Sequence, residues 1–173
     1  MRLAAEQIQP VAPETMRAVL GHVPTGVMVV TVAAPGGQAA RTANSFTSVS
    51  LEPPLVSVCF GATSPFATAL CAAGGWGVSV LADDQRALST HFARRETGRG
   101  LTGVPHTLGR HTGAALLTEA VVTMECRSVL THPAGDHVLI VAEVLAMQLR
   151  RDQPPLVFHR GDYHSIGPRL TWD

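Results

Sequence analysis

Apolar residues along this chain of 173 residues gather in short runs that are separated by turn-forming residues. Runs of this kind, rich in valine and bounded by Gly, Pro, Asn or Asp, are typical of β-strands. Pro35-Gly36-Gly37 predicts a turn with a return strand, and Pro133-Ala134-Gly135-Asp136 predicts a turn between two later strands. We predict strands at residues 27–32, 55–60, 76–81, 121–130, 138–147, 156–159 and 163–166.

Helical spacing of apolar residues is confined to three short segments, residues 14–22, 64–73 and 83–94. The second is predicted to begin at Ser64 as N-cap, with Pro65 at the first helical position. The third is predicted to be capped by Asp83 or Asp84. Residues 96–113 are glycine-rich, and we expect them to be irregular.

Short strands at hairpin spacing do not suggest a parallel sheet, whose strands alternate with longer helices. The pattern predicts a mainly β domain, an antiparallel barrel or sandwich with a few short helices. The length fits a single domain. We therefore expect an N-terminal arm at residues 1–13, one domain at 14–167 and a C-terminal tail at 168–173.

Composition narrows the class of protein further. Hydrophobic residues make up 46% of the chain and charged residues 15%, which argues against disorder. The formal net charge is zero, so no basic field points to nucleic acid or to an anionic membrane surface. Cys59, Cys71 and Cys126 are scattered and odd in number, so they do not form a disulfide framework. We expect them to be small core residues in preference to catalytic thiols. We expect a cytoplasmic protein, because no apolar run is long enough to span a membrane.

Several motifs that carry chemistry are missing from the sequence. It has no G-x-G-x-x-G after a strand, no phosphate-binding G-x-x-x-x-G-K-[ST], no G-x-S-x-G and no H-E-x-x-H. Three pairs among the eight histidines are spaced five apart, which does not place them on one helical face. We therefore expect no metal site.

One stretch of polar side chains stands out just before the strand at residues 55–60. It carries six short hydrogen-bonding side chains: Thr42, Asn44, Ser45, Thr47, Ser48 and Ser50. Such residues often bond their own backbone in a turn, but a turn needs only two or three. The alternative is an uncharged loop that cradles a planar heterocycle and a phosphate. The start of the helix at Ser64-Pro65 offers a second anion site, which together with the loop fits a phosphorylated ring cofactor.

Four blocks of the sequence, in order, resemble the flavin reductase-like family of small NAD(P)H:flavin oxidoreductases, which serve two-component monooxygenases. The resemblance covers most of the chain. The blocks are Pro24-Thr25-Gly26-Val27-Met28-Val29-Val30-Thr31, Thr42 to Ser50 with Pro53-Pro54-Leu55-Val56, Ala134-Gly135-Asp136-His137 and His159-Arg160-Gly161-Asp162-Tyr163.

The resemblance implies a split β-barrel of Greek-key type, a homodimer, and FMN or FAD bound near the dimer interface. It also implies NADH or NADPH as hydride donor and a separate flavin-dependent monooxygenase that receives the reduced flavin. An uncharged site would bind flavin only moderately, as suits a flavin that is a diffusible substrate. The alternatives are a flavoprotein with tightly held FMN that passes electrons to another acceptor, and a non-catalytic flavin-binding protein.

The resemblance also assigns site residues. Thr42, Ala43, Asn44 and Ser45 would face the isoalloxazine edge, and Pro24, Thr25, Gly26 and Val27 would line the ring. The ribityl chain and phosphate would be lined by Ser48, Ser50, Cys59, Phe60 and Ser64. The nicotinamide side would be bordered by Asp136 and His137, and by the block with His159, Arg160 and Tyr163.

His137 is the candidate catalytic residue, favoured as a nicotinamide contact over a proton donor. Both it and Tyr163 also have plain structural interpretations. A histidine after Gly-Asp is often a turn residue bonded to its neighbours, and Tyr163 would serve equally well in barrel packing.

Overall fold

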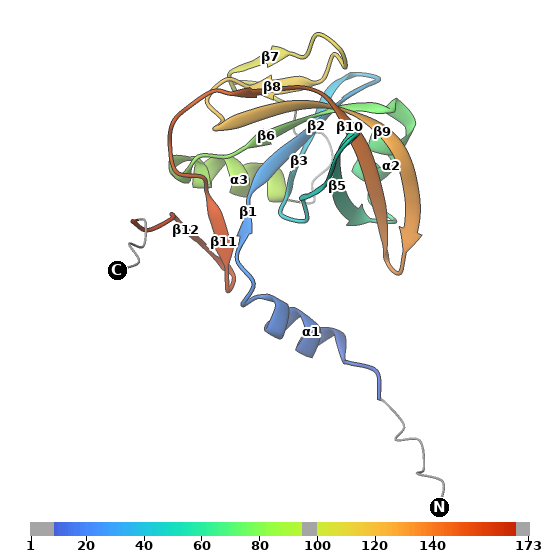
Figure 1. Ribbon diagram of the computed structural model, residues 1–173, viewed down its shortest axis with the longest axis vertical. Coiled ribbons are helices and arrows are strands. Elements are labelled where there is room, and N and C mark those ends of the chain that lie inside the picture. The colour runs from blue at the N-terminus through green and yellow to red at the C-terminus, as the bar shows by residue number, and fades with distance from the viewer. Residues whose placement is uncertain (1–8, 95–99, 169–173) are drawn as a thin grey trace, which may run out of the picture.

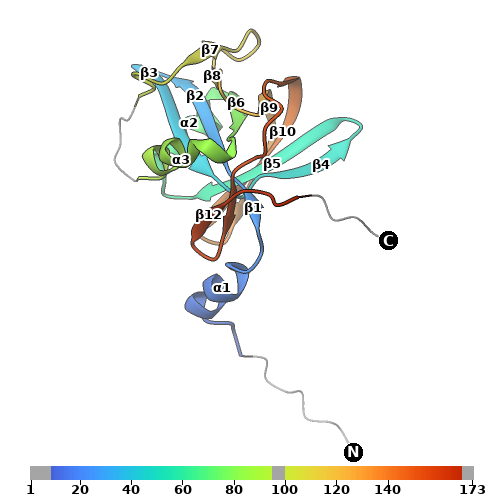
Figure 2. The ribbon, with the colours of Figure 1, turned by 90° about the vertical axis from the view of Figure 1, so that its left-hand side faces the viewer.

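The computed structural model describes residues 9–94 and 100–168, and Figures 1 and 2 show a strongly curved sheet flanked by helices. The helices are α1 (Pro13–Leu20), α2 (Pro65–Ala73) and α3 (Arg86–Ala93), the last preceded by the 3₁₀ turn η1 (Asp83–Gln85). The strands are β1 (Thr25–Gly26), β2 (Met28–Ala34), β3 (Gly37–Ala43), β4 (Thr47–Leu51), β5 (Pro54–Gly61), β6 (Gly75–Val80), β7 (His106–Leu108), β8 (Ala115–Leu117), β9 (Val122–Ala134), β10 (His137–Leu149), β11 (Val157–His159) and β12 (Asp162–His164). The mainly β class predicted from the sequence is confirmed.

Seven strands form one antiparallel sheet in the order β3-β2-β6-β9-β10-β5-β4. Its two edge strands, β3 and β4, are consecutive in the chain and are joined only by Asn44, Ser45 and Phe46. Such a connection spans at most roughly 14 Å, so the sheet must curl until its edges approach each other. Contacts between β3 and β5 complete this closure, and the fold is the expected split barrel.

A second, three-stranded sheet in the order β1-β11-β12 lies beside the barrel. Its hairpin turns at Arg160 and Gly161, which have φ of 53° and 84°. Two consecutive residues with positive φ are typical of the tight turns that match the strand twist in hairpins. The block from His159 to Tyr163 that resembles the family is therefore this hairpin.

Two apolar clusters hold the barrel together. The larger lies between the sheet and α2 and includes Val30, Val58, Trp76 and Ile140. The smaller lies under α3 and includes Leu81, Phe92 and Leu117, with Phe158 and Tyr163 packed against it. Since β3 lies between α2 and α3 and contacts both helices, its two faces serve the two clusters.

The three cysteines do not share the core environment that the sequence predicted. Cys126 is fully buried, and burial together with the charge of Glu125 raises its pKa to about 12. Cys59 is half-buried, and burial raises the pKa of its thiol. Cys71 is exposed on α2, so the prediction was wrong for this residue.

Three local predictions need correction. The polar stretch is not one loop, because Thr42 and Ala43 end β3 and Thr47–Leu51 forms β4. Asp83 and Asp84 do not cap α3: Asp83 accepts a bond from Ser165 (2.7 Å), and Asp84 pairs with Arg151 (2.9 Å). The described part of the glycine-rich segment is not irregular throughout, since β7 pairs with β8 there; residues 96–99 lie outside the described residues.

Helix α1 projects away from the barrel, as Figure 1 shows, and none of its residues is buried. The long β9–β10 hairpin also extends beyond the barrel in that view, and the β4–β5 hairpin does so in Figure 2. Across residues 9–94 and 100–168, the helices are all too short or too polar to cross a membrane.

Candidate functional site

The connection between β3 and β4, where the barrel closes, carries the residues predicted to face the isoalloxazine edge, Thr42 to Ser45. On one side of this connection, Thr42 at the end of β3 donates its hydroxyl proton to the backbone carbonyl of Ser89 on α3 (2.7 Å). On the other side, Ser45 contacts β5. Asn44 lies between them with an exposed side chain. The connection therefore links α3 to the edge of β5 that adjoins β4, and its exposed tip is Asn44.

The small sheet brings Thr25 and Tyr163 to the same side of the site. Thr25 is paired with Phe158, and Phe158 is paired with Tyr163, so the three side chains share one face of the sheet. The Phe158 and Tyr163 rings meet edge to face with centroids 5.4 Å apart. The hydroxyl oxygen of Thr25 is buried and has no hydrogen-bond partner among the described residues.

Tyr163 is half-buried and is held by contacts with Phe158, Ser89 and Arg86. Its hydroxyl is 2.9 Å from the hydroxyl of the buried Ser89, and the guanidinium of Arg86 lies 5.4 Å from its ring centre. Arg86 also pairs with Asp162 at 3.3 Å. These contacts favour the structural interpretation of Tyr163, as an anchor that fixes the β11–β12 hairpin on α3. Ser89 is a site residue that sequence reasoning missed; a serine within an otherwise ordinary amphipathic helix gives no signal for it.

His159 is in the same hairpin, but its side chain belongs to the opposite face from Tyr163. There its ring lies 5.7 Å from that of His164 and 6.3 Å from that of His22, between ring centres. Arg160, at the turn, donates its backbone N–H to the carbonyl of Gly21 (2.8 Å). This part of the block therefore contacts the base of α1 and not the β3–β4 connection.

The hydroxyl of Ser45 is a structural bridge. It donates to the carbonyl of Cys59 (2.9 Å) and accepts from the backbone N–H of the same residue (3.1 Å). Both backbone groups of Cys59 that face the barrel seam are thereby satisfied by one side chain. Ser45 therefore ties the connection to β5, and a bulky apolar side chain here would remove both bonds.

His137 begins β10 at the tip of the long hairpin, where it is paired with Gly61 of β5. Its Nδ1 lies 2.8 Å from a carboxylate oxygen of Asp136, and this hydrogen bond lowers the pKa of Asp136. The backbone carbonyl of Asp136 accepts from the N–H of Ala62 (2.9 Å), which docks the turn on the β5–α2 connection. The His137 ring is about half exposed, with 49% of its side-chain surface accessible.

The residues assigned to the ribityl chain and phosphate are not brought together within one chain. Ser50 is paired with Leu55 at the far end of β5, six residues before Gly61 and the loop to Ser64. At about 3.3 Å per residue this separation is roughly 20 Å, so Ser50 and Ser64 cannot hold the same phosphate. The side chain of Phe60 is buried in the core, where it packs edge to face on Phe66.

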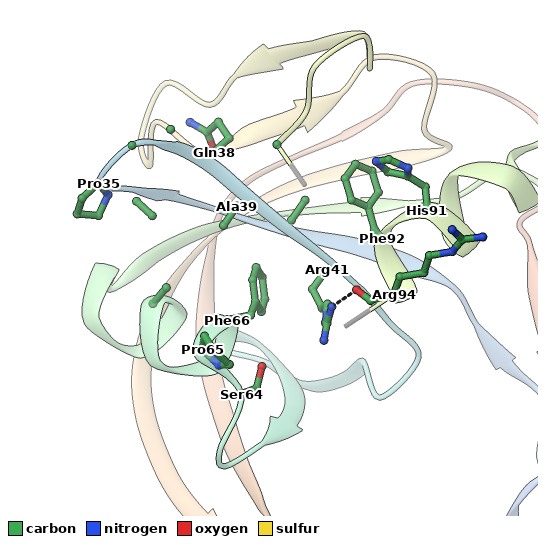
Figure 3. Close-up of a pocket in the computed structure, with 16 residues that line it drawn as sticks. Pro35, Gln38, Ala39, Arg41, Ser64, Pro65, Phe66, His91, Phe92 and Arg94 are labelled. Carbon is green, nitrogen blue, oxygen red and sulfur yellow. Dashed lines mark hydrogen bonds between the residues drawn. The ribbon is translucent and has the colours of Figure 1, made fainter. Parts of the chain in front are cut away.

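Ser64 lies instead at one end of a cavity of about 310 Å³ that runs along β3 between α2 and α3. Figure 3 shows the Ser64 side chain at the same end of this cavity as the Arg41 side chain, whereas the Arg94 side chain points away from Ser64. Arg41 donates a hydrogen bond to the backbone carbonyl of Arg94. The hydroxyl of Ser64 does not cap α2, although Ser64 occupies the N-cap position that the sequence predicted. No feature of the sequence indicated that Arg94 would line this cavity.

These features fit a phosphorylated ring cofactor. The β3–β4 connection carries no charged side chain, and the buried Thr25 hydroxyl lacks a partner that a polar ring atom would supply. The end of the cavity offers the guanidinium of Arg41 and the start of a helix, which is where an anionic phosphate binds favourably. A neutral connection next to this cationic group fits a flavin with its phosphate.

Comparison with known proteins finds flavin reductases among the proteins that this chain resembles. The chain is 41% identical to the NADH-dependent FMN reductase AsuE2 of Streptomyces nodosus subsp. asukaensis, over 87% of this chain and 83% of that protein. It is 33% identical to HsaB of Rhodococcus jostii, the reductase subunit of a flavin-dependent monooxygenase, over 98% and 84%. The solved structure of the NADH:FAD oxidoreductase SgcE6 of Streptomyces globisporus, in complex with NAD and FAD fragments, superposes with a TM-score of 0.87. It is 35% identical, over 96% of this chain and all of that one.

The model of the flavin reductase-like domain matches residues 20–167, nearly the whole described chain. The ordered blocks of the sequence, the split barrel and these relatives all agree, and the protein belongs to the flavin reductase-like family.

Proposed function

We propose that the protein is an NADH-dependent flavin reductase that takes flavin as a diffusible substrate and releases it reduced. The observation that carries this proposal is the uncharged β3–β4 connection, in a chain whose named relatives are NADH-dependent flavin reductases. At the ring edge, neutral hydrogen bonds of modest net strength would permit release of the flavin.

Within this proposal the chain itself supplies binding and orientation. A bound flavin would accept a hydride from the nicotinamide at its N5 atom, and this transfer needs no nucleophile from the protein. Backbone N–H groups of the connection from Thr42 to Ser45 would hold the ring edge and stabilise negative charge on it. The Thr25 hydroxyl would bond a polar ring atom, and Tyr163 would keep the hairpin wall in place. Orientation of this kind is the main source of rate for a direct transfer.

We place the nicotinamide on the side of His137 and Asp136. The imidazole is exposed, and its orientation is set by the 2.8 Å contact with the Asp136 carboxylate. His137 lies on the outer face of the sheet in β10, the strand next to β5. Ser45 anchors the β3–β4 connection to β5. His137 would therefore position the hydride donor and would not be required as an acid or base.

We also propose a homodimer and an oxygenase as partners. Helix α1 exposes Met16, Val19 and Leu20 by 55%, 63% and 52%. An isolated helix of eight residues is not stable in water without packing. We therefore expect another protein surface to cover the apolar face of α1. A second copy of the chain is the occupant that the resemblance implies. The client for reduced flavin would be a separate flavin-dependent monooxygenase, as for the relative HsaB.

The experiment is a steady-state assay of NADH and NADPH oxidation with FMN, FAD and riboflavin in turn. We expect NADH oxidation only when free flavin is added, and a colourless protein after gel filtration. The His137→Ala variant should raise the KM for NADH by up to roughly 100-fold, with flavin affinity unchanged. If added flavin does not stimulate oxidation of NADH or NADPH, the protein is not a flavin reductase. A protein that stays yellow after gel filtration would indicate the alternative with tightly bound FMN.

A further inference from the structure

The C-terminal half of β10 has one edge without a neighbouring strand. β9 pairs with β10 as far as Leu149, whereas β5 pairs with it only from His137 to Glu143. On the β5 side, residues 144–149 therefore carry N–H and C=O groups that no strand among the described residues pairs. We call these residues the open edge of β10. An edge of this kind can accept an extended peptide as an additional strand.

A polar pocket of about 330 Å³ adjoins this open edge. Ala146, Met147 and Gln148 line it in succession. The face of a strand presents alternate residues, so a pocket lined by successive ones reaches the edge of the strand. The β7–β8 hairpin forms a second wall through Thr107 and Leu116, which are paired with each other.

The pocket carries positive charge that the described residues do not neutralise. The guanidinium of Arg150 lies 3.4 Å from the hydroxyl oxygens of both Thr107 and Thr123, which line the pocket with it. Neither Arg150 nor Arg110, a further lining residue, forms an ion pair with a described Asp or Glu. The only carboxylate in the described lining, that of Glu125, is buried and accepts four hydrogen bonds from the β7–β8 loop. An incoming carboxylate would therefore meet unpaired guanidinium groups.

Exposed apolar side chains occupy the other face of the open edge. Met147 and Leu149 are each 68% exposed. Met147 is paired with Met124 of the larger apolar cluster, whereas Gln148 is paired with Thr123 of the pocket. Successive positions along the open edge therefore face an apolar surface and the cationic pocket in turn.

A strand added to the open edge would alternate in the same way. Every second side chain would pack on Met147 and Leu149, and those between would enter the pocket beside Arg150. We propose that the open edge of β10 docks an extended segment of another protein in which apolar and acidic side chains alternate. Backbone hydrogen bonds would supply affinity, and the pocket would select the acidic residues.

A small free anion fits the pocket less well than a side chain of a docked segment. Thr107, Arg110 and Gln148 of the lining are exposed. A small molecule there would stay largely in water, whereas ligand sites bury roughly 70–90% of their ligand. A docked strand covers the pocket with its own backbone.

The position of the open edge favours a partner other than a second copy. Figure 1 shows the β7–β8 hairpin at the opposite end of the barrel from α1, which the proposed homodimer uses. Gln38 at the start of β3 donates to the carbonyl of Gly113 beside β8 (2.9 Å). Asn44 of the β3–β4 connection is six residues further along, about 20 Å away. A segment docked here leaves the connection and α1 accessible, as the client monooxygenase would require; only this identification of the partner rests on the proposed function.

The probe is the fluorescein-labelled peptide Val-Glu-Val-Glu-Val-Glu, and its charge-reversed counterpart is Val-Lys-Val-Lys-Val-Lys. Fluorescence anisotropy without flavin or nucleotide measures binding to the full chain. We expect a submillimolar Kd for the acidic peptide and binding at least about 10-fold weaker for the lysine peptide. Arg150→Gln and Arg110→Gln should each weaken binding of the acidic peptide about 10-fold. Arg127→Gln is the matched control, because it removes an exposed arginine of the same hairpin outside the pocket.

Hydrogen–deuterium exchange tests the mode of docking. The acidic peptide should slow amide exchange at residues 144–149 and leave exchange at residues 137–143, which β5 already pairs, unchanged. Exchange that does not slow at residues 144–149 would overturn strand addition. Because Arg110 is exposed, its variant keeps the test decisive if Arg150→Gln does not fold.

Failure of the acidic peptide to bind, or equal loss of binding in Arg127→Gln and the two pocket variants, would overturn the inference. So would displacement of the peptide by N-acetylglutamate at similar concentration, since the pocket would then be a site for small anions. A parent protein larger than a dimer whose mass falls in Arg110→Gln would place a second copy on the open edge and would also overturn it. Flavin-stimulated NADH oxidation should be unchanged in these variants. Peptide binding by a protein without that activity refutes only the proposed function.

Discussion

Ser45 lies in the stretch predicted to bind flavin, but its side chain stabilises the closure of the barrel. Its hydroxyl contacts both the N–H and the C=O of Cys59, across the seam where the curled sheet brings its edges together. The half-buried backbone groups of Cys59 have this side chain as a partner in place of water. Asn44, one residue earlier, is exposed and is therefore better placed for a ligand.

We predict that Ser45→Ala lowers the free energy of unfolding by about 1–3 kcal/mol, because two backbone groups lose their partner in a partly buried place. Urea denaturation at neutral pH measures this change. The control is Ser48→Ala on the adjoining strand, where the hydroxyl is exposed and the change should be within about 0.5 kcal/mol. Equal stability of the two variants would show that the bridge to Cys59 contributes nothing.

At the level of elements, Glu125 of β9 holds the loop between β7 and β8. Its carboxylate accepts backbone N–H bonds from Arg110 (3.1 Å), His111 (2.7 Å) and Thr112 (2.8 Å), and a hydroxyl bond from Thr112 (3.0 Å). A Cβ atom on Gly109 would lie 2.7 Å from the Glu125 carboxyl carbon, so only glycine fits there. Burial would raise the pKa of Glu125, but these hydrogen bonds outweigh it and lower the pKa below its ordinary 4.5.

We predict that Glu125→Gln destabilises the protein at pH 7 by about 2–3 kcal/mol, because the amide NH₂ would face N–H donors. A carboxyl whose folded-state pKa is lowered stabilises the fold above its unfolded-state pKa. That contribution is lost as the pH falls through the folded-state pKa. The gap between parent and variant in urea denaturation should therefore be full at pH 7 and should shrink below about pH 4.5.

The matched control is Glu143→Gln on β10, whose carboxylate forms an exposed pair with Arg127 (2.6 Å). Exposed pairs of this kind contribute about 0–1 kcal/mol. If the Glu125 variant loses no more stability than this control, or if its deficit does not change with pH, the carboxylate does not hold the loop as we describe.

At the scale of the whole molecule, the apolar face of α1 has no partner within the described chain. Met16, Val19 and Leu20 lie within an arc of about 100° on the helix, and Ala18 lies on the opposite side. Exposed apolar side chains also gather on the projecting strands at Val49 and Leu51 of β4 and at Val129 and Leu130 of β9. In the proposed homodimer, α1 of one copy would cover such a surface on the other.

We predict that the double variant Val19→Glu with Leu20→Glu converts a dimer into a monomer, because two carboxylates would be buried without partners. Size-exclusion chromatography with light scattering measures the mass. Ala18→Glu, on the polar side of α1, should leave the dimer intact. A parent protein that is monomeric at micromolar concentration, or a double variant that stays dimeric, would contradict the interface.

Several features were predictable from the sequence because they depend on local chemistry. The apolar runs predicted most strands to within a few residues, since burial of one face imposes the period of two. The turns at Gly36, Gly135 and Gly161 were predictable because these positions have positive φ, which glycine adopts without strain. The order of the four sequence blocks identified the family, and with it the fold that brings them together.

Only the tertiary structure decided what the polar side chains do. Ser45 and Thr42 were both predicted to bind a ligand. In the structure, the Ser45 hydroxyl bonds Cys59 across the barrel seam and the Thr42 hydroxyl bonds Ser89 on α3. Ser50 and Ser64 read as one phosphate site, yet β4 and β5 carry them in opposite directions. A hydroxyl in a sequence does not reveal its partner, because the partner is set by which distant strands and helices packing brings within 3 Å. The sequence alone therefore determined the fold and the family, while closure of the barrel determined which polar groups remain for a ligand.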